Sequence, residues 1–328
     1  MNSDLLMRVV QAIADESILD LTELAHAVVD QERRSGHNKL ADQLDHIIKT
    51  KRIRKQGSSS ANKSSLKELP VSRRYQEELV TLIPLDQLEH HMVLPPEIEE
   101  RFQRIEKEYA ARERLGAFGL KNRKSILLYG QPGCGKSLGA KRIAWNTGLP
   151  LLKVRFDALL SSYFGESASN LRQVFEAAKE RPSVLLLDEC DFIARSRTNS
   201  RDIGEASRIV NSLLQLMENF DAPGLLVATT NVEDSLDNAL FRRFDDVFQV
   251  PPPGPKEIEG LLKTTLSAIK LADRTDWQSL VKKLSGSSAA MTVKAAQDAA
   301  KAAVLSGEKI VTEKHLLKAI SELRDSNS

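Results

Sequence analysis

The fold is decided by residues 125–137, Ser-Ile-Leu-Leu-Tyr-Gly-Gln-Pro-Gly-Cys-Gly-Lys-Ser. Its short apolar run, 126–128, is typical of a strand buried inside a parallel sheet. Residues 130–137 then have the spacing G-x-x-x-x-G-K-S of a phosphate-binding loop. An amphipathic segment at 138–143 predicts a helix whose positive amino end faces the same loop. With a strand before and a helix after, a chance glycine turn is the weaker interpretation.

Each residue type in this loop has a chemical role. Its glycines let the backbone bend so that successive N–H groups point at phosphate oxygens. The ammonium of Lys136 would reach the β- and γ-phosphates, and the hydroxyl of Ser137 would bind Mg²⁺. A nucleotide with β- and γ-phosphates, together with Mg²⁺, is therefore the expected ligand. The predicted nucleotide-binding residues are Gly130, Gln131, Pro132, Gly133, Cys134, Gly135, Lys136, Ser137 and Leu138.

Two carboxylates follow a second apolar run. Residues 184–187 are Val-Leu-Leu-Leu, and Asp188 and Glu189 come directly after them. A buried strand would release these acids at its carboxyl end, where open α/β sheets bind ligands. We expect Asp188 to share the Mg²⁺ site with Ser137, and Glu189 to polarise the attacking water.

Three further polar residues are candidates for catalysis. Asn231 ends a predicted strand over 224–230 and could orient water, although a strand-end Asn often only forms an Asx turn. Arg242 and Arg243 could neutralise charge on a transferring phosphoryl group, also from a neighbouring subunit. The alternative for this pair is a solvated basic surface. The Phe-Asp that follows and the short sequence distance from Asn231 favour catalysis.

The predicted elements indicate an α/β fold. Strands alternate with amphipathic helices over 82–250, which implies a mostly parallel sheet with helices on both faces. After the proline-rich break at 251–255 the pattern is only helical. The expected domains are a helical N-terminal module (1–56), a flexible linker (57–81), an α/β nucleotide subdomain (82–250) and a small all-helical lid (251–328).

Composition sets limits on partners and compartment. The 328 residues carry a net charge of +2, with 41% hydrophobic and 28% charged residues, as in an ordinary globular protein. This balance gives no argument for nucleic acid, and the basic run 49–55 lacks interleaved aromatic rings for base stacking. The two cysteines, no evident signal peptide and no long apolar run together predict a cytoplasmic protein without membrane association.

Taken together, these motifs resemble the AAA ATPases, the ring-forming branch of the P-loop NTPases. Residues 130–137, Asp188-Glu189, Asn231 and Arg242-Arg243 are similar in order and type to the family's Walker A loop, Walker B pair, sensor-1 residue and trans-acting arginine fingers. The resemblance covers about 82–328. It implies Mg-dependent ATP hydrolysis and a homo-oligomer, usually a hexamer, with sites at subunit interfaces. Glu218-Asn219 departs from the family's usual Asp-Gly.

A further resemblance concerns Tyr163-Phe164-Gly165, which precede Glu166-Ser167. In protein-remodelling members an aromatic–hydrophobic–Gly loop lines a central pore and grips a polypeptide. The alternative is that these rings close over a local core. A second pore loop is expected within 195–204. The resemblance implies a ring motor that unfolds or threads a protein substrate.

The N-terminal stretch 30–42 is similar to small bacterial AAA proteins encoded beside a subtilisin-like serine protease. Those pairs act in plasmid maintenance or anti-phage defence, so a protease partner is expected. Two rival functions remain open. One is an ATP-controlled docking switch for a partner protein, and the other is a nucleic-acid motor or loader of the same fold.

Overall fold

The computed structural model describes residues 69–72, 76–160, 166–190, 203–231, 242–272, 275–307 and 310–325. The chain divides into two units, Met1–Glu68 and Leu69–Ser328, and all described residues belong to the second. The predicted N-terminal module and most of the predicted linker therefore lie outside the described residues. So do Tyr163, Phe164, Gly165 and most of the predicted second pore loop.

The strands of the second unit are β1 (Val80–Ile83), β2 (Ser125–Tyr129), β3 (Leu151–Val154), β4 (Val184–Leu187), β5 (Leu225–Thr230), β6 (Asp246–Gln249), β7 (Lys270–Leu271) and β8 (Ile310–Val311). Its helices are η1 (Leu85–Gln87), α4 (Pro96–Ala110), α5 (Arg112–Ala117), α6 (Lys136–Thr147), α7 (Phe156–Leu160), α8 (Ser167–Glu180), α10 (Ile203–Glu218), α12 (Pro255–Thr265), α13 (Trp277–Leu284), α14 (Ala289–Leu305) and α15 (Glu313–Asp325).

The central sheet has six strands in the order β1-β3-β4-β5-β2-β6. The pairs β3–β4, β4–β5, β5–β2 and β2–β6 are parallel, and β1 is antiparallel to β3. The predicted mostly parallel sheet is therefore confirmed. Since β5 lies between β2 and β4, the strand ends that precede the glycine-rich loop, Asn231 and Asp188 are neighbours at one edge.

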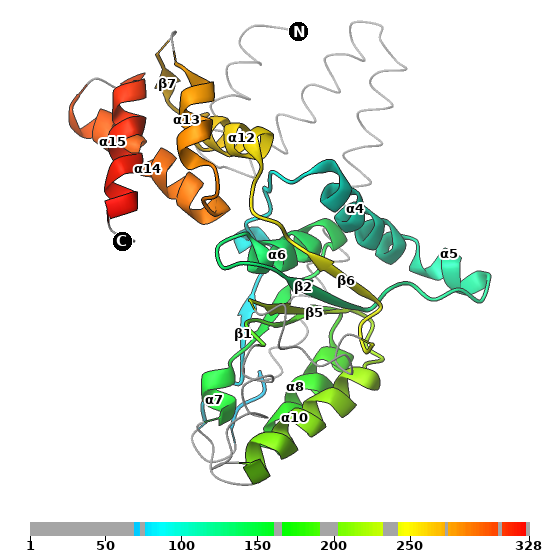
Figure 1. Cartoon of the computed structure of the whole chain (residues 1–328). Helices are drawn as coiled ribbons and strands as arrows, with labels where there is room; N and C mark the ends of the chain where they lie inside the picture. The colour runs from blue at the N-terminus through cyan, green and yellow to red at the C-terminus, as the bar shows by residue number, and fades with distance from the viewer. Residues whose placement is uncertain are drawn as a thin grey trace, which may run out of the picture. The chain divides into compact units, whose positions relative to one another are not determined.

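Alternating side chains bury both faces of this sheet. Leu185 and Leu187 of β4 pack into one core with α8 and α10, whereas Val184 and Leu186 pack into another with α4 and α6. Figure 1 shows α8 and α10 on one side of the strands and α6 with α4 on the other. The prediction of helices on both faces is thus confirmed.

The sheet begins earlier than the sequence predicted. The linker was expected to run to residue 81, yet β1 starts at Val80, and both Leu79 and Val80 are fully buried. Burial in this segment does not alternate as in a half-buried strand. Leu79 and Val80 are both buried, whereas Leu82 is 42% exposed, so the sequence had no alternating pattern that would predict a strand. Pairing with β3 and packing against its core fix the strand, so the carboxyl boundary of the predicted linker is wrong.

The lid segment has its own core and a small addition to the predicted helices. Helices α12 to α15 share one apolar cluster, in which the alanines of α14 are buried: Ala295, Ala296, Ala299 and Ala303. The described residues also contain a parallel pair of two-residue strands, β7 and β8. The all-helical prediction is wrong at this point because such short strands have no detectable periodicity.

We expect Gly224→Ala to destabilise the fold strongly. A Cβ at Gly224 would lie 1.8 Å from the carbonyl oxygen of Ser183, a backbone atom that cannot rotate away. Moving β4 and β5 apart should cost roughly 2–4 kcal/mol and lower the melting temperature by on the order of 10 °C. Gly116→Ala is the matched control, since nothing lies within 4 Å of its added Cβ. Equal melting curves for both variants, recorded by circular dichroism, would contradict this prediction.

Candidate nucleotide-binding site

The glycine-rich loop has the bend that its sequence predicts. Gly130, Gly133 and Gly135 have φ values of 140°, 75° and 97°, in the left-handed range that favours glycine. Helix α6 begins directly afterwards at Lys136, whose side chain is buried. The Lys136 ammonium donates to the carbonyl oxygens of Gly130 and Gln131, each at 2.8 Å. The positive charge is therefore held over the loop, next to the helix amino terminus.

Asp188 is held by three donors at the carboxyl end of β4. Its Oδ1 accepts from the hydroxyls of Ser137 at 2.6 Å and Thr229 at 2.7 Å, and its Oδ2 accepts from Lys153 Nζ at 2.6 Å. Burial raises the pKa of Asp188, but the hydrogen bonds from Lys153, Ser137 and Thr229 outweigh it and leave the pKa below its usual value. The carboxylate is thus ionised at neutral pH.

Glu189 adopts an unusual backbone conformation beside it. Its φ is 56°, which is uncommon for a residue other than glycine and costs energy. The N–H of Glu189 donates to Thr229 Oγ1 at 2.9 Å, and the same hydroxyl donates to Asp188. Thr229 is almost fully buried, so its hydroxyl links the two carboxylate residues through β5.

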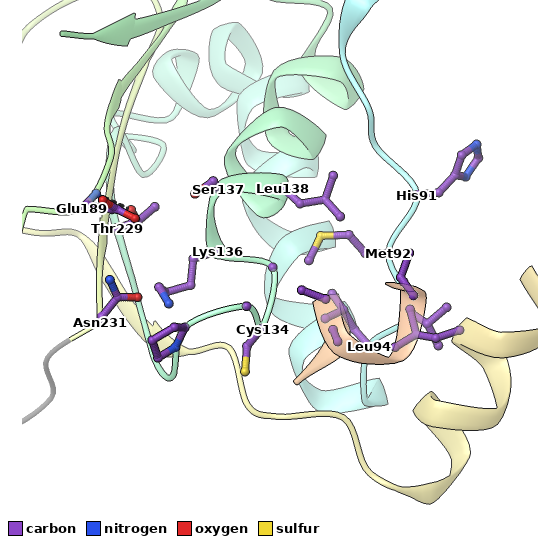
Figure 2. Close-up of a pocket in the computed structure, with 18 residues that line it drawn as sticks. His91, Met92, Leu94, Cys134, Lys136, Ser137, Leu138, Glu189, Thr229 and Asn231 are labelled. Atoms are coloured by element: carbon purple, nitrogen blue, oxygen red, sulfur yellow. Dashed lines mark hydrogen bonds between the residues drawn. The ribbon is translucent and has the colours of Figure 1, made fainter. Parts of the chain in front are cut away.

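Lys136, Ser137, Glu189 and Thr229 border a cavity of about 420 Å³. Figure 2 shows Glu189, Thr229 and Asn231 on one side of the loop that carries Lys136, and Met92 and Leu94 on the other. The cavity therefore has a polar end at the strands and an apolar end between the chain at 91–94 and two lid helices. Its lining residues are His91, Met92, Val93, Leu94, Pro132, Gly133, Cys134, Gly135, Lys136, Ser137, Leu138, Glu189, Thr229, Asn231, Leu261, Ala289, Ala290 and Val293.

The lid also contacts the loop directly. The N–H of Ala290, in the first turn of α14, donates to the carbonyl oxygen of Gly133 at 2.9 Å. A Cβ at Gly133 would lie 2.8 Å from Ser288 Oγ, so the close approach requires glycine there. The lining residues Met92, Val93, Leu94, Leu261 and Val293 had no sequence signal, because they come from an irregular segment and from ordinary helix faces. Thr229 and Lys153 carried none either.

Arg242 and Arg243 lie at the amino-terminal end of β2, whereas the cavity lies at the carboxyl ends of the strands. The carbonyl oxygen of Arg243 accepts from the hydroxyl of Ser125, the first residue of β2, whereas the loop follows the last residue of β2. At about 3.3 Å per residue, roughly 15 Å separates them. Arg243 forms an ion pair with Glu218 at 2.6 Å, and Arg242 is exposed. Neither arginine lines the cavity of its own chain.

The donor set fits the ligands that the sequence predicted. Mg²⁺ prefers oxygen ligands, and the hydroxyl of Ser137 and the carboxylate of Asp188 supply them at 2.6 Å from each other. The loop supplies N–H groups and the Lys136 ammonium for phosphates. Burial raises the pKa of the Cys134 thiol, although Lys136 nearby acts in the other direction. Cys134 is therefore a poor nucleophile.

Comparison with known proteins identifies the family. The family model for the ATPase family associated with various cellular activities (AAA) matches residues 126–252. A Sinorhizobium fredii protein named as an uncharacterized AAA family ATPase is 33% identical over 306 residues, covering 92% of this chain and 90% of that protein. The chain belongs to the AAA ATPase family.

Other relatives match a smaller part of this AAA ATPase. A proteasome-activating nucleotidase of Methanosarcina mazei is 32% identical over 237 residues, which are 70% of this chain and 56% of that protein. The ATP-dependent zinc metalloprotease FtsH of Helicobacter felis is 34% identical over 217 residues, 63% of this chain and 34% of that protein. The chain thus spans about half or less of these two proteins.

Family membership identifies the reaction of the protein. The AAA ATPase binds ATP with Mg²⁺ and hydrolyses it. Within the described ranges, none of its helices has the length and apolar character needed to cross a membrane.

Proposed function

We propose that this AAA ATPase assembles into a homo-oligomeric ring, a hexamer, and uses hydrolysis to pull a protein substrate through a central pore. The observation that carries the ring is the placement of Arg242 and Arg243 at the edge of the sheet away from their own cavity. Arginines so placed can complete a nucleotide site only on a neighbouring copy. A head-to-tail contact of this kind closes into a ring when the rotation between successive copies completes a full turn, as we propose for six copies.

The proposed roles follow from the positions of the side chains. Ser137 and Asp188 hold Mg²⁺, which neutralises charge on the phosphates, and Lys136 binds the β- and γ-phosphates. Glu189, held by Thr229, accepts a proton from the attacking water. Asn231 at the end of β5 orients that water. Arg242, with Arg243, stabilises the transferring phosphoryl group from the next subunit.

The protein substrate is the second part of the proposal. It is supported by the proteasome-activating nucleotidase and FtsH among the relatives and by the aromatic sequence at 163–165. A subtilisin-like serine protease partner, a role in bacterial defence or plasmid maintenance, and a cytoplasmic location belong to the same proposal. They rest on the resemblance of residues 30–42 and on composition.

The threading proposal predicts a specific effect of Tyr163→Ala. We expect basal ATP hydrolysis within about twofold of the unchanged protein, but loss of the stimulation that an unfolded protein such as casein produces. Tyr163→Phe should keep that stimulation, because under this proposal the aromatic side chain, and not its hydroxyl, contacts the substrate. Phosphate release with and without casein measures both quantities.

Two outcomes of this assay would instead support the rival functions. Unchanged stimulation in Tyr163→Ala would favour the docking switch, in which ATP only controls binding of a partner. Stimulation by single-stranded DNA larger than that by casein would favour a nucleic-acid motor.

A further inference from the structure

Lys153 is a charged residue where the strand pattern favours an apolar one. Its neighbours in β3, Leu151, Leu152 and Val154, are buried, and β3 lies inside the sheet between β1 and β4. Its partner is Asp188, the acidic residue directly after the neighbouring strand β4. Asp188 is the buried member of the pair formed with this lysine, and a buried carboxylate without a partner would carry a large desolvation cost.

The two members of this ion pair differ in exposure. The side chain of Lys153 is 45% exposed, whereas that of Asp188 is 9% exposed, and 2.6 Å separates Nζ from Oδ2. The ammonium therefore approaches Asp188 from the solvent side. A half-exposed lysine can change rotamer without opening the core, because its stem is flexible and its head stays hydrated.

The other two donors to Asp188 are neutral. Ser137 and Thr229 donate hydroxyl hydrogen bonds to Oδ1. Lys153 is the one basic side chain that forms an ion pair with Asp188 in the part of the chain that the structure describes. The charge of the proposed metal-binding carboxylate is thus balanced by a single cation that can leave.

We propose that Lys153 is a displaceable counter-ion of Asp188 that sets how much Mg²⁺ the enzyme needs. Lys153 acts through Asp188 as a positioning residue, so this inference rests on the proposed metal-binding role of Asp188. Without Mg²⁺, its charge balances the Asp188 carboxylate, which contacts Ser137 of the loop, and so weakens the repulsion between that carboxylate and bound phosphates. When Mg²⁺ binds, the same charge competes with the metal for Asp188 and repels it.

This arrangement predicts two effects of opposite sign for Lys153→Met. The Mg²⁺ concentration for half-maximal nucleotide binding should fall about tenfold, because a repelling charge is removed. Nucleotide binding in EDTA should weaken about threefold or more, because the Asp188 carboxylate, no longer balanced by a cation, repels the phosphates. Lys153→Arg keeps the charge and should preserve both values. A merely structural role of Lys153 would move both values in the same direction.

The experiment uses the full chain and a fluorescent, non-hydrolysable ATP analogue with a methylanthraniloyl group. Binding is titrated in EDTA and at rising Mg²⁺ for the unchanged protein, Lys153→Met and Lys153→Arg. Lys179→Met is the matched control, since Lys179 pairs with Glu176 on α8 and does not contact Asp188. Thermal melts check that each variant is folded. An unchanged or raised Mg²⁺ requirement in folded Lys153→Met would overturn the proposal.

Asp188→Asn separates this inference from the assignment on which it rests. If Asp188→Asn leaves the Mg²⁺ dependence unchanged, the proposed metal-binding role of Asp188 is wrong, and the inference about Lys153 fails with it. If Asp188→Asn raises the Mg²⁺ requirement while Lys153→Met behaves like the unchanged protein, only the inference about Lys153 fails.

Discussion

Replacing Glu189 by glutamine is expected to slow ATP hydrolysis by about 10²- to 10⁴-fold while ATP binding is retained. Glutamine has the size of glutamate but cannot accept a proton from water. The backbone N–H of Glu189 donates to the side-chain hydroxyl of Thr229. A change of the Glu189 side chain should therefore leave the unusual backbone conformation at this position intact. Steady-state phosphate release measures turnover, and the fluorescent analogue measures binding.

The control for this variant is Glu176→Gln on α8, an exposed residue that pairs with Lys179 away from the cavity. Its turnover should equal that of the unchanged protein. Turnover in Glu189→Gln within a few-fold of the control would show that another group activates the water.

Arg242→Ala is expected to lower hydrolysis by about 10³-fold with ATP binding intact, which is the order of effect of arginines supplied in trans. Arg242 is exposed and lies near the amino-terminal ends of the strands, so removal of its side chain should not change the cavity of its own chain. Arg114→Ala, an exposed arginine on α5, is the matched control and should hydrolyse ATP normally. Full activity of Arg242→Ala would remove the basis for the trans assignment.

Mixing the two inactive variants tests the same assignment more sharply. An Arg242→Ala subunit keeps Glu189, and a neighbouring Glu189→Gln subunit keeps Arg242. If the arginine acts across the interface, about a quarter of the sites in randomly mixed rings contain both groups, and activity returns. If the arginine acts within its own chain, no mixed ring contains a complete site, and the mixture stays inactive.

Much of the fold was predictable because its signals are local. Strands β2, β4 and β5 contain continuous apolar runs of three or four residues, and α8 and α10 carry clear amphipathic stripes. The first strand and the two-residue strands of the lid were not predictable. Their residues are strands only because β3 and the lid core lie next to them, which no local pattern records.

Part of the candidate site was likewise predictable from local sequence, and part of it was not. The loop at 130–137 and the acids after β4 have fixed spacing and were found from sequence. Thr229 and Lys153 were not, because each is defined by a contact with Asp188 from a neighbouring strand. Arg242 follows Asn231 closely in sequence, but in the structure it lies at the amino-terminal ends of the strands, whereas Asn231 lies at their carboxyl ends.

The hydrogen bond from the Ala290 N–H to the Gly133 carbonyl makes the free energy of docking the lid depend on the conformation of the loop. The carbonyl that accepts it belongs to the same bend whose N–H groups we propose to bind the phosphates. Any ligand that changes this bend therefore changes the free energy of lid placement. By thermodynamic linkage, an external force or contact that shifts the lid must alter nucleotide affinity by the same amount. Lid position and nucleotide affinity are thus coupled reciprocally through this hydrogen bond.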